Sequence, residues 1–331
     1  MDHSKLKHIP LFQIPPFQIP LYRLSFYAFA LIAGLYIFTP NLFSGQFNGF
    51  DIGQSPLIPL NEIRHGGPPK DGIPAIDEPE FISADAADFL QKTDRIVGTV
   101  TKEGAKAYPI RILNWHEIVN DGDIVISYCP LCGTAMAFKS APADFGVSGL
   151  LYNSDMLLYD RKTESLWSQI LGKAISGERK GELLETIPVE NTSWENWLNL
   201  HPNTQVLSEN TGYRRNYSAS PYAGYESSKS LYFPVSGQNQ RYHPKEKVIG
   251  LNINGTFKAY PFSELDKSKN NIVRDKLDGK EIEIIFNAQH RSATVRLKSG
   301  EVLPSLISYW FAWYAFHPDT LIYNAEKNWW F

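Results

Sequence analysis

An internal repeat is the feature that most constrains the fold of this chain. Gly98 is followed ten residues later by Tyr108 within Lys-Ala-Tyr-Pro, and the same spacing separates Gly250 from Tyr260 within a second Lys-Ala-Tyr-Pro. Later in each half, two tryptophans three residues apart precede a His-Pro pair. We therefore expect two copies of one unit that pack against each other.

The segments between these landmarks predict mostly β structure. Apolar runs of strand length alternate with turn residues, and aromatic residues make up 13% of a chain that holds 23 Gly and 22 Pro. We predict a mostly β (α+β) fold in which two pseudo-repeated, strand-rich units with short helices form one compact domain. The expected parts are a tail and anchor or signal (1–45), a tether and edge segment (46–93), repeat unit 1 (94–208), a Tyr-rich connector (209–245) and repeat unit 2 (246–325).

Finer patterns refine this division. Residues 101–104 have the composition of a hairpin turn, and residues 83–92 favour a short helix. The first copy also carries an insertion of about forty residues, beginning near residue 146, that the second copy lacks. Because only one copy has it, we expect that copy to hold the active surface.

The N-terminus differs in kind from the rest of the chain. Lys5, Lys7 and Arg23 precede an apolar run at residues 24–38 that Pro40 closes. A positive flank before such a run is typical of an export signal or a single anchor helix, and we favour an uncleaved anchor over a removed signal or a buried core helix. The remainder would then be an extracytoplasmic, periplasmic domain anchored in the inner membrane.

Charge and motifs exclude several functions. The net charge is −3 and no basic stripe interleaves with aromatic residues, so nucleic acid is not an expected partner. No glycine-rich phosphate loop, Gly-x-Ser-x-Gly elbow or His-Glu-x-x-His motif is present in the sequence. Kinase, dinucleotide-binding and ordinary hydrolase functions therefore have no support.

The two cysteines carry the strongest chemical signal. Cys129 and Cys132 lie in Cys-Pro-Leu-Cys-Gly, between runs that read as strands, so the motif is expected on a turn. Pro130 presets that turn and Gly133 tolerates a positive φ, which is the form of a metal knuckle. Two thiolates leave positions open on zinc or copper, and we predict a transition-metal site.

Two histidines are candidate further ligands. Laying one copy over the other places Cys132 on His290, so an imidazole from the second copy would meet thiolates from the first. His116, about a dozen residues before the motif, is the other candidate. The repeated His201 and His317 occur in both copies, including the copy without cysteines, and we interpret them as structural, like the repeated Lys-Ala-Tyr-Pro lysines.

Charged residues in the insertion are the candidates for catalysis. They lie among leucines, so they must be paired if they are buried. One interpretation is a salt-bridge network, and the other is a polar pocket that faces the metal. The four candidates are Asp155, Asp160, Arg161 and Glu164.

The favoured function is a membrane-anchored, extracytoplasmic metal-binding protein that acts in metal handling or in metal-assisted chemistry. Expected partners are the membrane, through the N-terminal segment, and a metal donor or an exported protein. One alternative is a thiol–disulfide oxidoreductase that uses Cys129 and Cys132, and a plain structural disulfide is another. A further alternative is a non-catalytic interaction module that uses the Tyr-rich connector.

Four motifs resemble a known family. They are Tyr-Cys-Pro-Leu-Cys-Gly-Thr-Ala at 128–135, Gly-Leu-Leu-Tyr-Asn-Ser-Asp at 149–155, Glu-Ser-Leu-Trp-Ser-Gln at 164–169 and Phe-Ala-Trp-Tyr-Ala-Phe-His-Pro at 311–318. With them, residues 90–325 resemble a bacterial and archaeal family catalogued as a domain of unknown function. The resemblance implies one domain and carries no activity with it.

Overall fold

The computed structural model describes residues 46–53, 55–139, 144–268 and 271–327. The predicted tail and anchor at residues 1–45 lie outside the described residues, and the prediction about them stays a prediction. Over the part of the chain that is described, no helix has the length and hydropathy needed to cross a bilayer.

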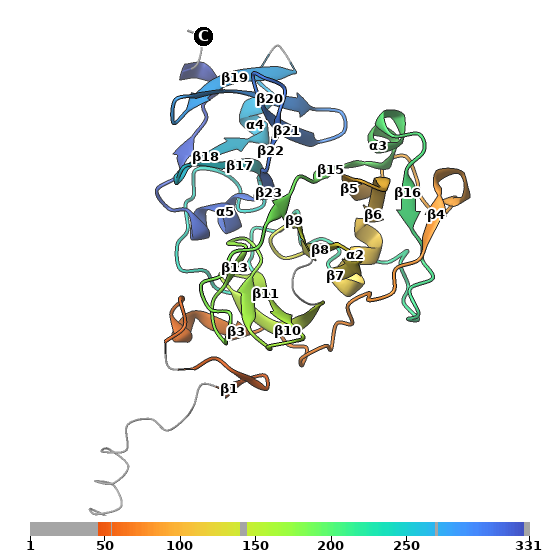
Figure 1. Cartoon of the computed structure of the whole chain (residues 1–331). Helices are drawn as coiled ribbons and strands as arrows, with labels where there is room; N and C mark the ends of the chain where they lie inside the picture. The colour runs from red at the N-terminus through yellow and green to blue at the C-terminus, as the bar shows by residue number, and fades with distance from the viewer. Residues whose placement is uncertain (1–45, 54, 140–143, 269–270, 328–331) are drawn as a thin grey trace, which may run out of the picture. The chain divides into compact units, whose positions relative to one another are not determined.

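Within these residues, five sheets of four or five strands are arranged as the blades of a five-bladed β-propeller (Figure 1). The helices are few and short, which confirms the mostly β prediction. A two-stranded sheet precedes the blades, formed by β1 (Gln46–Phe47) and β2 (Phe50–Asp51).

The first copy forms two of the blades. One has the order β15-β5-β6-β16-β4 and the other β14-β9-β8-β7. Its helices are α2 (Ile110–His116) and α3 (Trp194–Leu200). The strands are β4 (Phe81–Ser83), β5 (Arg95–Thr101), β6 (Gly104–Pro109), β7 (Ile118–Asp121), β8 (Ile124–Cys129), β9 (Thr134–Lys139), β14 (Thr186–Ile187), β15 (Glu190–Ser193) and β16 (Gln205–Leu207).

The second copy forms two more blades with the same pairing. Their orders are β23-β17-β18-β24 and β19-β20-β21-β22. As in the first copy, the leading hairpin has one antiparallel neighbour and one parallel neighbour. The elements are β17 (Lys247–Ile253), β18 (Thr256–Pro261), α4 (Phe262–Leu265), β19 (Ile272–Leu277), β20 (Lys280–Asn287), β21 (Ser292–Leu297), β22 (Val302–Leu303), β23 (Leu306–Tyr309), α5 (Trp310–Phe316) and β24 (Leu321–Ile322).

The fifth blade corrects the expectation of two matched units. The insertion in the first copy folds into a sheet of its own, in the order β13-β12-β11-β10-β3. The repeat therefore accounts for four blades, and an unrepeated hairpin-rich segment supplies the fifth. Its strands are β3 (Ile63–His65), β10 (Phe145–Tyr152), β11 (Asp155–Asp160), β12 (Leu166–Ser168) and β13 (Lys173–Ala174).

Residues 46–93 lend edge strands to two blades, because β3 pairs with β10 and β4 pairs with β16. The helix expected at residues 83–92 is only the 3-10 turn η2 (Ala84–Ala86). The other 3-10 turns are η1 (Leu60–Glu62) and η3 (Ala325–Lys327). The predicted hairpin at residues 101–104 is confirmed, since Thr101 pairs with Gly104 between β5 and β6.

Steric fit explains the repeated glycines and tryptophans. A Cβ on Gly98 would lie 2.5 Å from the ring of Trp197, and one on Gly250 would lie 2.0 Å from the ring of Trp313. Each indole donates its N–H to a threonine seven residues later, at 2.9 Å in both copies. The glycine therefore makes room for the tryptophan that fastens the helix of each copy to its sheet.

The other repeated residues are also structural. Lys106 and Tyr108 both bind the carboxylate of Asp121, at 2.9 and 2.6 Å. Lys258 and Tyr260 do the same at Asp275, at 2.6 and 2.9 Å. His201 and His317 pack on the indole of their own copy, with ring centroids 4.1 and 4.4 Å apart.

Candidate metal centre

The thiol turn lies where predicted, between β8 and β9, whose last register pair is Cys129 with Thr134. Gly133 has a φ of 62°, and a Cβ at this position would lie 2.8 Å from the ring of Tyr309. The Tyr309 amide also donates to the carbonyl oxygen of Cys132 at 2.8 Å. The turn therefore needs glycine, and the second copy clamps it from outside.

A second tight turn faces the thiols. Asn153 and Ser154 both have positive φ, 51° and 63°, and they join β10 to β11 as a two-residue hairpin loop. The side chain of Asn153 accepts from the amide of Ser236 at 2.7 Å and fixes the loop to the connector. The carbonyl oxygen of Ser154 then lies 3.3 Å from Sγ of Cys132. The residue that follows this loop is Asp155.

Three ligand-type side chains meet at this point. One ligand atom each from Cys129, Cys132 and Asp155 lies within 4.8 Å of the other two, and all three residues are buried. In a tetrahedral site with metal–sulfur bonds of about 2.3 Å and metal–oxygen bonds of about 2.0 Å, the ligand atoms lie about 3.3–3.8 Å apart. The three residues therefore have the donor types and the approximate spacing of a possible metal site.

The carboxyl group of Asp155 is only half satisfied. Its Oδ2 accepts from the amide of Ile170 at 3.1 Å, whereas Oδ1 is buried with no hydrogen-bond partner among the described residues. Burial raises the pKa of Asp155 to about 8. Burial also raises the pKa of both thiols. A cation at this position would compensate all three groups, because it favours their ionised forms.

The motif at residues 164–169 holds the strands on either side of the thiol turn through the side chain of Gln169. Gln169 accepts from the hydroxyl of Thr134 at 2.7 Å and donates to the hydroxyl of Ser127 at 2.9 Å. These contacts fix the chain so that the next residue, Ile170, presents its amide to Asp155. The side-chain network and the thiol turn are thus one connected unit.

Two residues of the site were missed from the sequence. Glu117 ends α2 with a φ of 59° and is buried, and its only side-chain partner among the described residues is the hydroxyl of Tyr222 at 3.3 Å. Burial raises the pKa of Glu117 to about 7. Tyr225 packs in the same core cluster as both cysteines, and its buried hydroxyl has no described partner. In the sequence, Glu117 was notable only because it follows the candidate ligand His116. Tyr225 was notable only as one of the tyrosines of the connector.

The predicted histidine ligands do not join this group. His116 is fully buried, but its ring nitrogens contact the carbonyl oxygen of Pro74 at 2.8 Å and the hydroxyl of Tyr217 at 2.6 Å. The ring of His290 contacts the hydroxyl of Ser193 at 2.7 Å.

The overlay that suggested His290 is correct in register, because Asn287 pairs with Ser292 as Cys129 pairs with Thr134. The two equivalent turns belong to different blades, however, and β21 packs beside β15. Cys132 and His290 therefore occupy equivalent positions in the two copies, but this equivalence does not bring their side chains together.

Of the four charged candidates in the insertion, the structure brings Asp155 alone to the cysteines. Asp160 accepts from the amide of Thr163 and from the indole of Trp167, which closes the loop after β11. Arg161 pairs with Asp77 at 2.6 Å. Glu164 pairs with Lys70 at 2.5 Å. The pairs of Arg161 and Glu164 match the salt-bridge interpretation, whereas the carboxylate of Asp160 is satisfied by hydrogen bonds.

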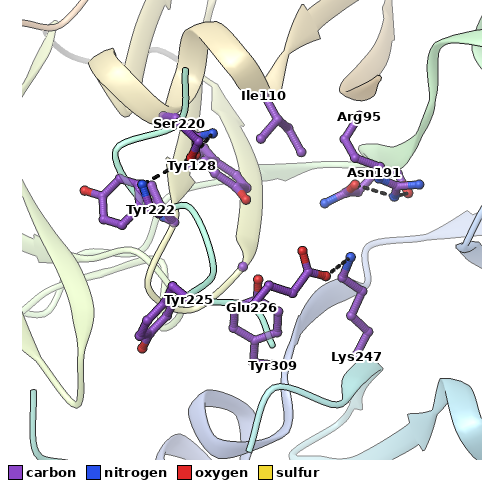
Figure 2. A pocket seen from close by; sticks show the side chains of 13 residues that line it. Arg95, Ile110, Tyr128, Asn191, Ser220, Tyr222, Tyr225, Glu226, Lys247 and Tyr309 are labelled. Atoms are coloured by element: carbon purple, nitrogen blue, oxygen red, sulfur yellow. Dashed lines mark hydrogen bonds and ion pairs between the residues drawn. The ribbon is translucent and has the colours of Figure 1, made fainter. Parts of the chain in front are cut away.

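A small cavity lies beside the thiol turn (Figure 2). It has a volume of about 120 Å³ and is partly open to solvent, and Pro130 and Gly133 of the turn form part of its wall. The remaining wall is polar and aromatic. It is made by Arg95, Ile110, Asn114, Tyr128, Asn191, Ser220, Tyr222, Tyr225, Glu226, Lys247 and Tyr309.

Fold and site together define a β-propeller domain with a buried dithiol–carboxylate group under a polar cavity. The chain belongs to the family described as "Protein of unknown function (DUF3179)", whose model matches residues 70–303. The resemblance to a domain of unknown function is thereby confirmed. No curated protein and no solved structure matches the chain.

Proposed function

We propose that the protein binds one transition-metal ion, zinc or copper, through Cys129, Cys132 and Asp155. The observation that carries the proposal is the convergence of three buried acidic ligands around an unpartnered carboxylate oxygen. An unpartnered polar atom in a protein interior is costly unless something absent from the chain satisfies it. Sulfur and oxygen donors together suit zinc, and thiolates also suit copper(I).

Three protein ligands leave a position open on a four-coordinate ion, which is the pattern of catalytic and transfer sites. When bound, such an ion would act as a Lewis acid on an oxygen of a substrate or of water. The chain's own residues would orient the ligands: Gln169 fixes the thiol turn, and Asn153 fixes the hairpin that presents Asp155. Metal handling and metal-assisted chemistry are both compatible with this arrangement.

The alternatives find less support. Cys129 and Cys132 are 1% and 0% exposed, and their raised pKa disfavours the thiolate that disulfide exchange requires. They also lie on a strand–strand turn, where no helix dipole activates them. In the connector, Tyr217 and Tyr225 are buried, so these two tyrosines pack inward instead of forming an interaction surface.

Two parts of the proposal rest on the sequence. The positively flanked apolar run at residues 24–38 supports an anchored domain on the extracytoplasmic side of the membrane. A protein in that compartment would receive its ion from a metal donor or meet an exported partner. Fractionation of cells that express the full chain, with and without residues 1–45, tests this placement.

The metal proposal is tested by titrating the reduced, metal-free full chain with zinc and, anaerobically, with copper(I), followed by elemental analysis after desalting. We expect one ion per wild-type chain and none in the Cys129→Ser, Cys132→Ser double variant. Asp155→Asn should bind at least about tenfold more weakly, because a charged ligand is lost. Glu164→Gln is the matched control, since its carboxylate pairs with Lys70 away from the thiols. Equal metal content in all four proteins would refute the proposal.

A further inference from the structure

The wall of the cavity beside the thiol turn includes a partly buried cation, Arg95, that forms no ion pair among the described residues. The guanidinium of Arg95 donates to the carbonyl oxygens of His290, Asn191 and Arg291, at 2.5, 2.7 and 3.1 Å, and to the side chain of Asn191 at 2.6 Å. Its Nε is buried without a partner, and no carboxylate of the described chain lies within ion-pair distance. Burial lowers the pKa of Arg95 to about 10, although the nearby charges of Glu226 and Glu190 oppose this shift.

The other two charges of the wall cancel each other. Lys247 pairs with Glu226 at 2.7 Å, and Figure 2 shows this pair on the side of the cavity below Arg95 and Asn191. With Arg95, the wall therefore carries two positive charges and one negative charge. This excess of one positive charge on the wall attracts an anion from solution.

Hydroxyl groups supply directional donors to the same space. Figure 2 shows the hydroxyls of Tyr128 and Tyr309 pointing into the cavity from opposite sides. Neither hydroxyl has a hydrogen-bond partner in the described part of the chain, and neither is sealed in the core like the hydroxyl of Tyr225. Each is therefore free to donate to an oxygen of a ligand.

We propose that this cavity binds a small monoanionic carboxylate. Its volume of about 120 Å³ suits a ligand of few non-hydrogen atoms. A carboxylate offers two oxygens to the two phenols and one charge to the excess positive charge of the wall. Glu226 disfavours a dianion such as phosphate. This inference goes beyond the metal proposal and does not depend on it, although an ion at the thiols would lie across the turn from the ligand.

The test is calorimetric titration, above about pH 8 where inorganic phosphate is mainly the dianion, of the metal-free full chain kept in chelator. The ligands are formate, acetate and glycolate, with inorganic phosphate and tetramethylammonium in parallel. We expect saturable binding of at least one carboxylate, and no binding of phosphate or of the cation. Lys247→Met leaves Glu226 unbalanced and should weaken carboxylate binding about tenfold or more. The Tyr128→Phe, Tyr309→Phe double variant should weaken it as well.

Lys102→Met is the matched control, because it removes an exposed lysine that pairs with Asp123 far from the cavity wall. Its affinity should equal that of the wild type. No carboxylate binding, tighter phosphate binding or equal affinity in the Lys247 variant would each overturn the proposal. Because metal is absent throughout, none of these results bears on the metal site. Circular dichroism of each variant separates loss of binding from loss of folding.

Discussion

Replacing Asp155 by asparagine should make the metal-free protein more stable, and the gain should grow with pH. Burial holds the pKa of this carboxyl near 8 in the folded chain, against 3.8 for an unperturbed aspartate. The folded state therefore binds more protons than the unfolded state between these two values. The contribution of this protonated carboxyl to the free energy of unfolding is fully present below about pH 4, and it is lost as the pH rises to about 8.

The magnitude follows from linkage. In this window each pH unit lowers the unfolding free energy of the wild type by about 1.4 kcal/mol. Raising the pH from 5 to 7 should therefore lower it by about 3 kcal/mol. Asparagine keeps the shape and can still accept from the amide of Ile170, but it has no proton to lose. The variant should lack this pH-dependent loss.

The assay is urea denaturation of both proteins in chelator and reductant at pH 5, 6, 7 and 8, followed by tryptophan fluorescence. The difference in unfolding free energy should widen steadily with pH. Asp123→Asn is the control, because this exposed carboxylate pairs with Lys102 and its pKa is lowered. A difference that stays constant over the four pH values would refute the assignment of Asp155 as a buried carboxyl without a counter-ion.

Three further predictions concern the scaffold. Asn153→Ala should lower zinc affinity about 10–100-fold, measured by competition with a chromophoric chelator, because the hairpin that presents the carboxylate ligand loses its fixed φ and its tie to the connector. Gly250→Ala should destabilise the fold by about 1–3 kcal/mol in urea, since its Cβ meets an indole at 2.0 Å, whereas Gly237→Ala, with its nearest atom at 3.9 Å, should change little. Asp275→Asn leaves the ammonium of Lys258 without its counter-ion and should cost about 3 kcal/mol, read as a lower thermal midpoint.

The sequence predicted the parts of the fold that local spacing controls. The distance from Gly98 to Tyr108 sets a hairpin register that recurs between Gly250 and Tyr260, and both hairpins formed as expected. The thiol turn followed from proline and glycine in the right places. In contrast, the fifth blade pairs β10 with β3 from the presumed tether, a long-range contact that no local pattern encodes.

The ligand set was harder to predict for the same reason. Asp155 stood out only as a charge among leucines, and nothing in its neighbourhood linked it to Cys129 or Cys132. The repeat suggested His290, but equivalent positions in two copies need not lie close together in space. The ring of His290 instead forms a hydrogen bond with the hydroxyl of Ser193. The carboxylate reaches the thiols because the two-residue loop between β10 and β11 of one blade lies against the thiol turn of another blade.

The contact between Tyr309 and the thiol turn determines when this turn can form during synthesis of the chain. The Tyr309 amide holds the carbonyl oxygen of Cys132, although 177 positions separate these residues in the chain. A ribosome, or a secretion pore, would have to release nearly the whole polypeptide before the turn could take its final form. An ion that needs the final form of this turn would therefore bind tightly only after Tyr309 has been released, and chains truncated before Tyr309 should bind it more weakly.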